Sequence, residues 1–404
     1  MTVELREAKR MTPGPPSLEE LKRRAETLVP VLRERAAKTE ALRRLPDETI
    51  GDLHATGLFR MLQPARVGGS ECPYRALVEL AAIVGRGCGS TAWVLNNLAS
   101  HHWMLAYWPK AAQDEVWGPS PEALIGSAFN FPGGRARKVN GGYRLSGRWP
   151  FSSGVDASAW NMIAAVVLDE QTGGSEFRVF LVPASDYAVI DTWHVSGLAG
   201  TGSKDVAADD VFVPEHRTLS TEAGKGAASP GSAVNASPVF RLPWFALFGF
   251  VIAGVSLGIA RGAIEQYVTG ARTRIGTYTG RGLADFSTMQ VHVAEAGALI
   301  DAAEALMLKD CAEAMHAAEA GRVPPMEDKV RWRRDGAYAA RLCTKAVDII
   351  FTAAGGAAIY ESNPLQRAFR DIHAANGHFG VNWDANGINY GRVALGQPPD
   401  TANL

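Results

Sequence analysis

The sequence is poor in cysteine and carries no excess of either charge. Its 404 residues include four cysteines, Cys72, Cys88, Cys311 and Cys343, which lie far apart. Their spacing matches neither a metal-ligand motif nor a disulfide framework, and it suits a reducing cytoplasm. The formal net charge is −1, and no long basic run is present. Because nucleic-acid binding needs clustered Lys and Arg, this balance argues against nucleic acid as the main partner.

Two further features are missing. The N-terminus carries charges early and has no apolar signal core, so we expect a cytoplasmic protein. No Gly-x-Gly-x-x-Gly opens a βαβ unit, so no nicotinamide site is evident.

One uncharged stretch, residues 243–260, approaches the length of a membrane span. It is rich in glycine and stands alone, so we predict a helix buried in a bundle or subunit interface, and no membrane partner.

Helical patterns occupy about the first 115 residues of the chain. Residues 1–15 are polar and Pro-rich at their end, and we expect them to be disordered. Ser17-Leu18-Glu19-Glu20 is a capping box that opens the first helix. Further helices are predicted at 47–58, 74–84 and 91–107.

The pattern changes to β-structure between residues 123 and 214. Apolar residues there alternate with polar ones or run continuously between Gly-Gly pairs. The predicted strands are 123–129, 143–151, 160–168, 177–183 and 206–213. A succession of strands without intervening helices predicts an antiparallel barrel or sandwich. Residues 221–237, rich in Gly, Ala and Ser, are predicted to form a flexible loop.

The chain is helical again from residue 244. Periodic segments at 244–275, 286–320, 325–354 and 364–395, with short connections, predict a four-helix bundle. The expected fold class is therefore α+β and multidomain. Its predicted units are an N-terminal helical domain at 16–120, a central antiparallel β-domain at 121–235 and a C-terminal helical bundle at 236–404.

One stretch of the β-region combines a strand, a turn and two hydroxyl groups. Gly141-Gly142 predicts a hairpin turn, and the strand that follows breaks at Pro150. The break leads into Phe151-Ser152-Ser153-Gly154, whose glycine lets another group approach the backbone closely. From these residues alone, a Ser-rich turn and a binding loop are equally good interpretations.

The order of helices, β-domain and bundle resembles the acyl-CoA dehydrogenase fold over nearly the whole chain. Four local signatures carry the resemblance: Gly200-Thr201-Gly202-Ser203-Lys204-Asp205-Val206 with Asp210-Val211-Phe212-Val213-Pro214; Tyr267, Arg272, Ile275-Gly276, Phe286 and Gln290; Gly355-Gly356; and Arg370-Asp371. The second is similar to a stretch that contacts flavin at a subunit interface of tetramers. The resemblance thus implies flavin and a homotetramer.

Dehydrogenase activity does not follow from the resemblance. Classical members place a catalytic Glu about nine residues after the Arg-Asp pair, where it removes the proton next to the thioester. Here that count reaches Gly380, between Phe379 and Val381. No carboxylate stands there, and His378 lies beside the position instead.

This departure resembles the flavin-dependent monooxygenase branch of the fold, the oxygenase components of two-component hydroxylases. Members act on p-hydroxyphenylacetate, steroid-derived phenols and dibenzothiophene, and residues 238–244 are also similar to this branch. By resemblance, residues 151–154 present a hydroxyl to flavin N5. His101, in Ala-Ser-His-His-Trp, resembles a substrate-side histidine on the fourth helix, and His378 one facing it from the C-terminal helix.

The resemblance implies a reaction of reduced FAD or FMN with O2 to a C4a-hydroperoxide, protected by a hydrogen bond near N5. A histidine would then deprotonate or polarise a phenol or indole. The expected catalytic residues are His378, His101 and Ser153. The expected flavin-binding residues are Ser127, Ser152, Ser153, Arg272, Gly355 and Gly356. Each of these residues also has a purely structural alternative. The serines would cap a turn, the histidines would be hydrogen-bonded in the interior, and Arg272 would form a salt bridge on a helix surface.

We therefore predict a monooxygenase that hydroxylates an aromatic or polycyclic small molecule. A separate NAD(P)H-dependent reductase would supply the reduced flavin, and no metal is expected. Three alternatives stay open: an acyl-CoA dehydrogenase or oxidase, an N- or S-oxygenase on the same fold, and a non-catalytic binding protein. The sequence decides neither FAD against FMN nor which of Ser152 and Ser153 faces N5.

Overall fold

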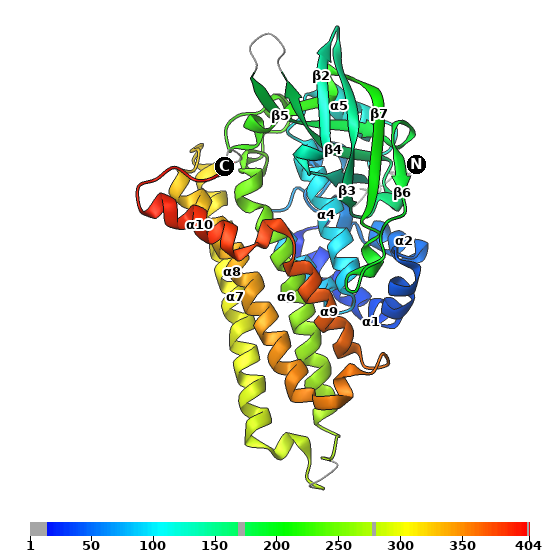
Figure 1. The fold of residues 1–404 in the computed structure, drawn as a ribbon, viewed down its shortest axis with the longest axis vertical. Coiled ribbons are helices and arrows are strands. Elements are labelled where there is room, and N and C mark those ends of the chain that lie inside the picture. The colour runs from blue at the N-terminus through cyan, green and yellow to red at the C-terminus, as the bar shows by residue number, and fades with distance from the viewer. Residues whose placement is uncertain (1–13, 169–173, 277–279, 402–403) are drawn as a thin grey trace, which may run out of the picture.

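The computed structural model describes residues 14–168, 174–276, 280–401 and 404. A β-sheet lies at one end of the molecule, and long helices extend away from it (Figure 1). Most of the predicted disordered N-terminus, residues 1–13, lies outside the described residues. The order of helices, sheet and helices is the predicted one.

The N-terminal helices pack beside the sheet and the upper part of the bundle (Figure 1). They are α1 (Leu18–Leu42), α2 (Asp47–Thr56), α3 (Ala76–Val84), α4 (Gly89–Leu105) and α5 (Lys110–Trp117). The Ser17 hydroxyl accepts a hydrogen bond from the Glu20 N–H at the start of α1, as the capping box predicts. Every residue of α4 is buried, so polar side chains on this helix must find partners inside the protein.

The central sheet has the strand order β6-β7-β3-β2-β4-β5-β8, with β1 paired to β4. Its strands are β1 (Ile125–Ala128), β2 (Gly134–Val139), β3 (Gly142–Ser152), β4 (Trp160–Leu168), β5 (Ser175–Pro183), β6 (Ala188–Ile190), β7 (Lys204–Pro214) and β8 (Thr218–Ser220). The five predicted strands are confirmed, whereas β2, β6 and β8 were missed. Most pairs are antiparallel, but β2 runs parallel to β4 because the chain reverses twice between them.

The C-terminal half forms the predicted bundle, with one correction. Its helices are α6 (Trp244–Ala271), α7 (Ser287–Glu319), α8 (Met326–Ala354), α9 (Pro364–Asn376) and α10 (Trp383–Ala394). The prediction of one helix over 364–395 is wrong, because the 3-10 turn η13 (Phe379–Val381) separates α9 from α10. The chain breaks there because the His378 and Asn382 side chains cap backbone N–H groups of η13 and α10.

The apolar helix α6 is enclosed by α3, α4, α8 and α9, as predicted for a buried helix. By length and mean hydropathy alone, Trp244–Ala271 and Met326–Ile359 could cross a membrane, and the first is 83% buried in the fold. A Cβ on Gly258 would lie 2.6 Å from the Ala81 carbonyl oxygen, so glycine permits the close approach of α6 to α3.

Residues 221–237 are less irregular than predicted. They contain the 3-10 turns η8 (Thr221–Gly224) and η9 (Pro230–Ala233). The Gly231 N–H donates to the Tyr107 carbonyl, and Asn235 donates to that of Ala106. These contacts hold the segment against the residues that follow α4, and two short 3-10 turns interrupt the predicted loop.

Candidate active site

The Ser-rich turn joins the end of β3 to the face of α4. Phe151 has a left-handed backbone (φ 68°) and is 65% exposed, and Gly154 is also left-handed (φ 71°). A Cβ on Gly154 would lie 3.0 Å from a Val94 methyl on α4. Glycine is therefore needed for conformation and for packing, and it lets the turn lie directly against the helix.

The two serines of the turn have different surroundings. Ser152 is fully buried and accepts a hydrogen bond from Asn161 Nδ2 on β4 over 2.8 Å. Ser153 is 8% exposed and accepts from the indole Nε1 of Trp93 on α4 over 2.9 Å. Ser153 Oγ also lies 2.7 Å from Ser203 Oγ. Both hydroxyls thus take part in long-range contacts, which a simple turn-capping role would not require.

His101 is held in one tautomer by the backbone of β1. Its Nδ1 lies 2.6 Å from the Ile125 carbonyl oxygen, which can only accept, so Nδ1 carries the proton. The other nitrogen, Nε2, then presents a lone pair, and it is buried without a partner among the described residues. Burial lowers the pKa of His101 to about 4, so the ring is neutral near pH 7.

His378 takes the opposite tautomer. Its Nδ1 accepts a hydrogen bond from the Gly380 N–H over 3.0 Å, so the proton is on Nε2. The ring is partly accessible but lies among the rings of Trp93, Phe248 and Phe379, and burial lowers its pKa to about 4. The expected position on a C-terminal helix is wrong, because His378 caps η13 between two helices.

The indole of Trp93 connects Ser153 with His378. It donates to Ser153 and meets the His378 ring edge-on, with 5.7 Å between ring centroids. His101 follows Trp93 by eight residues on α4, about 12 Å along the helix axis. There it meets Phe129 edge-on at 6.1 Å. The proposed catalytic side chains therefore all lie on or against α4, with a free lone pair on the His101 ring and a proton on Nε2 of the His378 ring.

The other expected flavin residues divide into two groups. Ser127 is half-buried on β1, in parallel register with Met162 of β4. Arg272, Gly355 and Gly356 lie instead at the ends of α6 and α8, at the end of the bundle far from the sheet (Figure 1). All three are exposed, and a Cβ on either glycine would meet nothing within 4 Å.

Arg272 makes no salt bridge with any described residue, so the alternative of an intrachain ion pair is not realised. Its neighbour Arg274 donates to the Ala354 carbonyl and lines a cavity of about 430 Å³ with Tyr267 and Tyr360. Sequence reasoning did not consider Arg274. The available signal was the position of Arg274 between Arg272 and Ile275-Gly276, inside a signature that resembles a flavin-contacting stretch.

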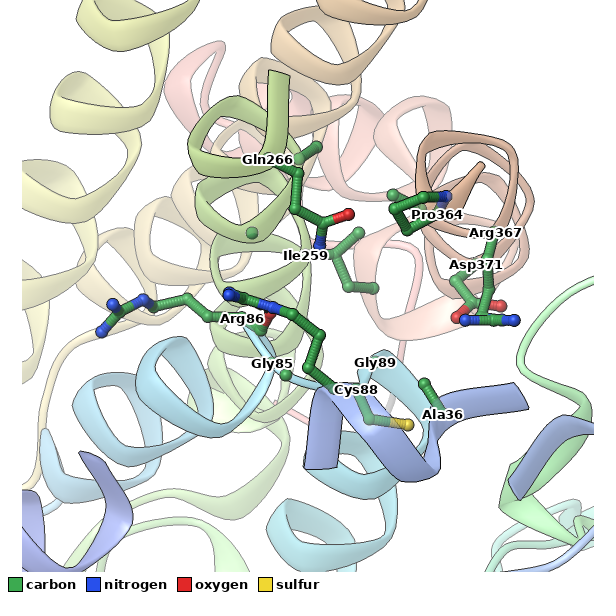
Figure 2. A pocket seen from close by; sticks show the side chains of 15 residues that line it. Ala36, Gly85, Arg86, Cys88, Gly89, Ile259, Gln266, Pro364, Arg367 and Asp371 are labelled. Carbon is green, nitrogen blue, oxygen red and sulfur yellow. Dashed lines mark hydrogen bonds between the residues drawn. The ribbon is translucent and has the colours of Figure 1, made fainter. Parts of the chain in front are cut away.

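The Arg-Asp signature anchors the loop before β7. Asp371 is buried and accepts from the Leu198 N–H over 2.6 Å, while Arg370 donates to the Ser196 carbonyl and pairs with Glu40. Burial raises the pKa of Asp371 to about 6. Figure 2 shows Asp371 on α9 across a cavity of about 50 Å³ from Cys88 and Gly89 at the start of α4.

The position of the dehydrogenase base holds no acid. Phe379 is exposed, and Gly380 and Val381 are buried, on η13. Among the described residues no cluster of His, Cys, Asp or Glu could hold a metal ion, and the four cysteines are buried and free. The unpartnered Nε2 of His101 can accept a hydrogen bond from a bound organic molecule.

Comparisons with known proteins identify the family of this chain. The family models for the N-terminal and C-terminal domains of acyl-CoA dehydrogenase match residues 18–120 and 250–383. The oxygenase component of FADH(2)-dependent resorcinol hydroxylase from Rhizobium sp. (strain MTP-10005) is 37% identical, covering 91% of this chain and 92% of the relative. The oxygenase subunit HsaA of a flavin-dependent monooxygenase from Rhodococcus jostii (strain RHA1) is 36% identical, covering 93% and 98%.

Solved structures point to the same family. The HsaA monooxygenase from M. tuberculosis superposes with a TM-score of 0.91 at 34% identity, covering 96% of this chain and all of the other. XiaF from Streptomyces sp., in complex with FADH2 and glycerol, has a TM-score of 0.89 at 34% identity, covering 96% and 98%. The chain belongs to the flavin-dependent monooxygenases of the acyl-CoA dehydrogenase fold, as an oxygenase component.

Proposed function

We propose that this monooxygenase hydroxylates a phenol- or indole-like aromatic molecule with reduced FAD or FMN and O2. A separate NAD(P)H-dependent flavin reductase supplies the reduced flavin. The observation that carries the proposal is the buried Nε2 of His101, a hydrogen-bond acceptor without a partner. A phenol O–H or an indole N–H provides the donor that this site lacks. A sulfur heterocycle such as dibenzothiophene has no such donor, so S-oxygenation is disfavoured.

His101 polarises a phenol rather than removing its proton before the reaction. A phenol has a pKa near 10, and the pKa of His101 is about 4. Complete proton transfer to His101 before the reaction is therefore unfavourable. A hydrogen bond to Nε2 still shifts electron density into the aromatic ring, and the proton follows as the new C–O bond forms.

Ser153 and His378 serve the flavin side of the same site. Bound reduced flavin supplies the electrons that activate O2. In this proposal Ser153 lies beside flavin N5, because Ser152 is fully buried. His378 offers its Nε2–H from a group of aromatic rings that includes Trp93 and Phe248. These rings exclude water from the place where oxygen is transferred.

The chain works as a homotetramer in this proposal. Ser153 follows β3 of the sheet, whereas Arg272, Gly355 and Gly356 lie at the ends of α6 and α8, at the end of the bundle far from the sheet (Figure 1). We infer that one flavin does not touch both groups within one chain. A second copy of the chain would bring the two groups to one flavin. Each copy keeps its three units, residues 16–120, 121–235 and 236–404. Exposed apolar side chains on the outer bundle surface support such an interface: Tyr338, Ile359, Tyr360, Ile388 and Leu395.

A paired-substrate assay tests the function. The purified chain, supplied with reduced flavin, is given a set of phenols and indoles and the matching O-methyl and N-methyl compounds. We expect hydroxylated products, identified by mass, from the donor-bearing members only. Equal turnover of the methylated compounds would contradict the role of His101. Bleaching of bound FAD by acyl-CoA thioesters would instead support the dehydrogenase alternative.

A further inference from the structure

Three buried hydroxyl groups form a continuous chain that starts at Ser153. Ser153 Oγ lies 2.7 Å from Ser203 Oγ, which lies 2.7 Å from Thr201 Oγ1. Thr201 Oγ1 lies 2.9 Å from the Leu198 carbonyl oxygen. At the other end, Trp93 Nε1–H donates to Ser153 over 2.9 Å. The three hydroxyl-bearing residues are 8%, 4% and 1% exposed, so water scarcely competes for these contacts.

Each hydroxyl has one proton, so both O···O contacts can be hydrogen bonds in three arrangements. If Ser153 and Thr201 both donate to Ser203, the Ser203 proton has no partner and the contact from Thr201 to Leu198 is lost. The other two arrangements run along the chain in opposite directions. In the first, Ser153 donates to Ser203, Ser203 to Thr201, and Thr201 to the Leu198 carbonyl. In the second, Thr201 donates to Ser203 and Ser203 to Ser153, so the Ser153 proton has no partner and the contact from Thr201 to Leu198 is lost. The first direction contains one more hydrogen bond and is therefore favoured in the free protein.

The favoured direction decides what Ser153 offers to a ligand. Its proton is committed to Ser203 and one lone pair accepts from Trp93, which leaves one lone pair free. Reduced flavin carries a proton on N5 and donates, whereas oxidised flavin has a bare N5 that accepts. A serine with a free lone pair and no free proton matches only the reduced form.

We propose that Ser203 and Thr201 are positioning residues that keep the Ser153 hydroxyl an acceptor, and that they thereby make the site prefer reduced to oxidised flavin. The inference rests on the proposed function, which places Ser153 beside N5. It suits an oxygenase that must take up reduced flavin and release oxidised flavin in every turnover.

The chain is anchored by the Arg-Asp pair of α9. Leu198 has a left-handed backbone (φ 53°), and its N–H donates to Asp371. Arg370 holds the same loop through the Ser196 carbonyl. The direction of the Leu198 carbonyl, and with it the end of the hydroxyl chain, is thus fixed by a helix that is distant in sequence.

The experiment compares dissociation constants for reduced and oxidised flavin, measured anaerobically by titration. Thr201→Val removes the last hydroxyl at nearly constant volume. Ser203 then turns to donate to Ser153, whose proton becomes free for a bare N5. We expect the ratio of the oxidised to the reduced constant to fall by roughly three- to tenfold, the equivalent of about one hydrogen bond. Ser203→Ala should lower the ratio in the same way if Thr201→Val does not fold.

Two controls show whether the hydroxyl is the cause. Thr201→Ser keeps the hydroxyl and should restore the wild-type ratio. Ser158→Ala removes a nearby buried hydroxyl that donates to the Gly154 carbonyl outside the chain, and should leave the ratio unchanged. A wild-type ratio in both Thr201→Val and Ser203→Ala would overturn the inference, as would a lowered ratio in Thr201→Ser or Ser158→Ala.

One more variant separates this inference from the proposed function. If Ser153→Ala alters neither dissociation constant, Ser153 is not beside the flavin, and the proposed site and the inference both fail. If Ser153→Ala alters the ratio while Thr201→Val and Ser203→Ala do not, the proposed site stands and only the hydroxyl chain is overturned.

Discussion

At the scale of single residues, the two histidines differ because their backbone partners differ. A carbonyl oxygen faces Nδ1 of His101, whereas an N–H faces Nδ1 of His378. The same imidazole therefore offers a lone pair at one position and a proton at the other. Neither ring needs to change its charge to play its part.

Removing the acceptor should slow oxygen transfer but not flavin oxidation. We expect His101→Ala to lower phenol hydroxylation on the order of 10²-fold while O2 is still consumed and released as hydrogen peroxide. His378→Ala should also lose product formation on that scale. The measurement is the ratio of product to O2 consumed, with thermal unfolding as the check on folding. If both variants keep the wild-type ratio, the assigned roles are wrong.

The low histidine pKa values predict that lowering the pH reduces stability but leaves the coupling of product formation to O2 consumption unchanged. Burial lowers the pKa of His101 and His378 to about 4 and that of His102 to about 3, against about 6.5 in an unfolded chain. Below pH 6.5 the unfolded chain binds protons that the folded protein excludes. The stability from these groups is thus complete above pH 6.5 and is lost as the pH falls towards 4.

The two consequences are measured separately. Between pH 5.5 and 8 the ratio of product to O2 should stay flat, because both rings remain neutral. The free energy of unfolding in urea should fall over the lower part of that range. A step in the coupling ratio near pH 6.5 that disappears in His101→Asn would contradict the assignment.

At the scale of elements, the turn at 151–154 depends on its contact with α4. We expect Gly154→Ala to destabilise the protein by about 1–2 kcal/mol, because it strains a left-handed residue and its Cβ meets Val94 and Leu98. It should also weaken flavin binding, since Ser153 is its neighbour. The matched control is Gly297→Ala on α7, where a Cβ meets nothing within 4 Å.

The control should shift the stability in the opposite direction. An alanine in the middle of a helix is favoured over glycine by about 0.5–1 kcal/mol. Chemical denaturation measures the change in the free energy of unfolding for both variants, and the two changes should have opposite signs. Equal stability of Gly154→Ala and the wild type would show that the turn does not depend on this contact.

At the scale of the whole molecule, the separation of Ser153 from Arg272 predicts a shared site. Light scattering should show a homotetramer at micromolar concentration. Ser153→Ala and Arg272→Ala should each weaken flavin binding and activity alone. Co-expressed, the two variant chains should recover activity, because a mixed pair contains one site with both wild-type side chains. A monomer, or mixed chains no more active than the variants alone, would contradict the prediction.

Much of the architecture follows from local sequence. Alternation of apolar residues located five strands to within two residues, and the count from Arg370-Asp371 showed that no acid stands at Gly380. The serines of 151–154 and both histidines were selected through the resemblance to the family, because local sequence left a Ser-rich turn and a binding loop equally good. The strands and helices depend on neighbours close in the chain, where periodicity and residue type carry the information.

The tertiary structure decided the rest. The short strands β2, β6 and β8 form because partners are in place, and Gly377 to Asn382 end a helix that periodicity alone extends. Which proton His101 carries depends on the Ile125 carbonyl, and the hydrogen bonds of Ser153 depend on Trp93 and Ser203. Sequence determines which groups the chain has. The direction of a hydrogen bond between them depends on a partner that only the folded backbone brings within 3 Å.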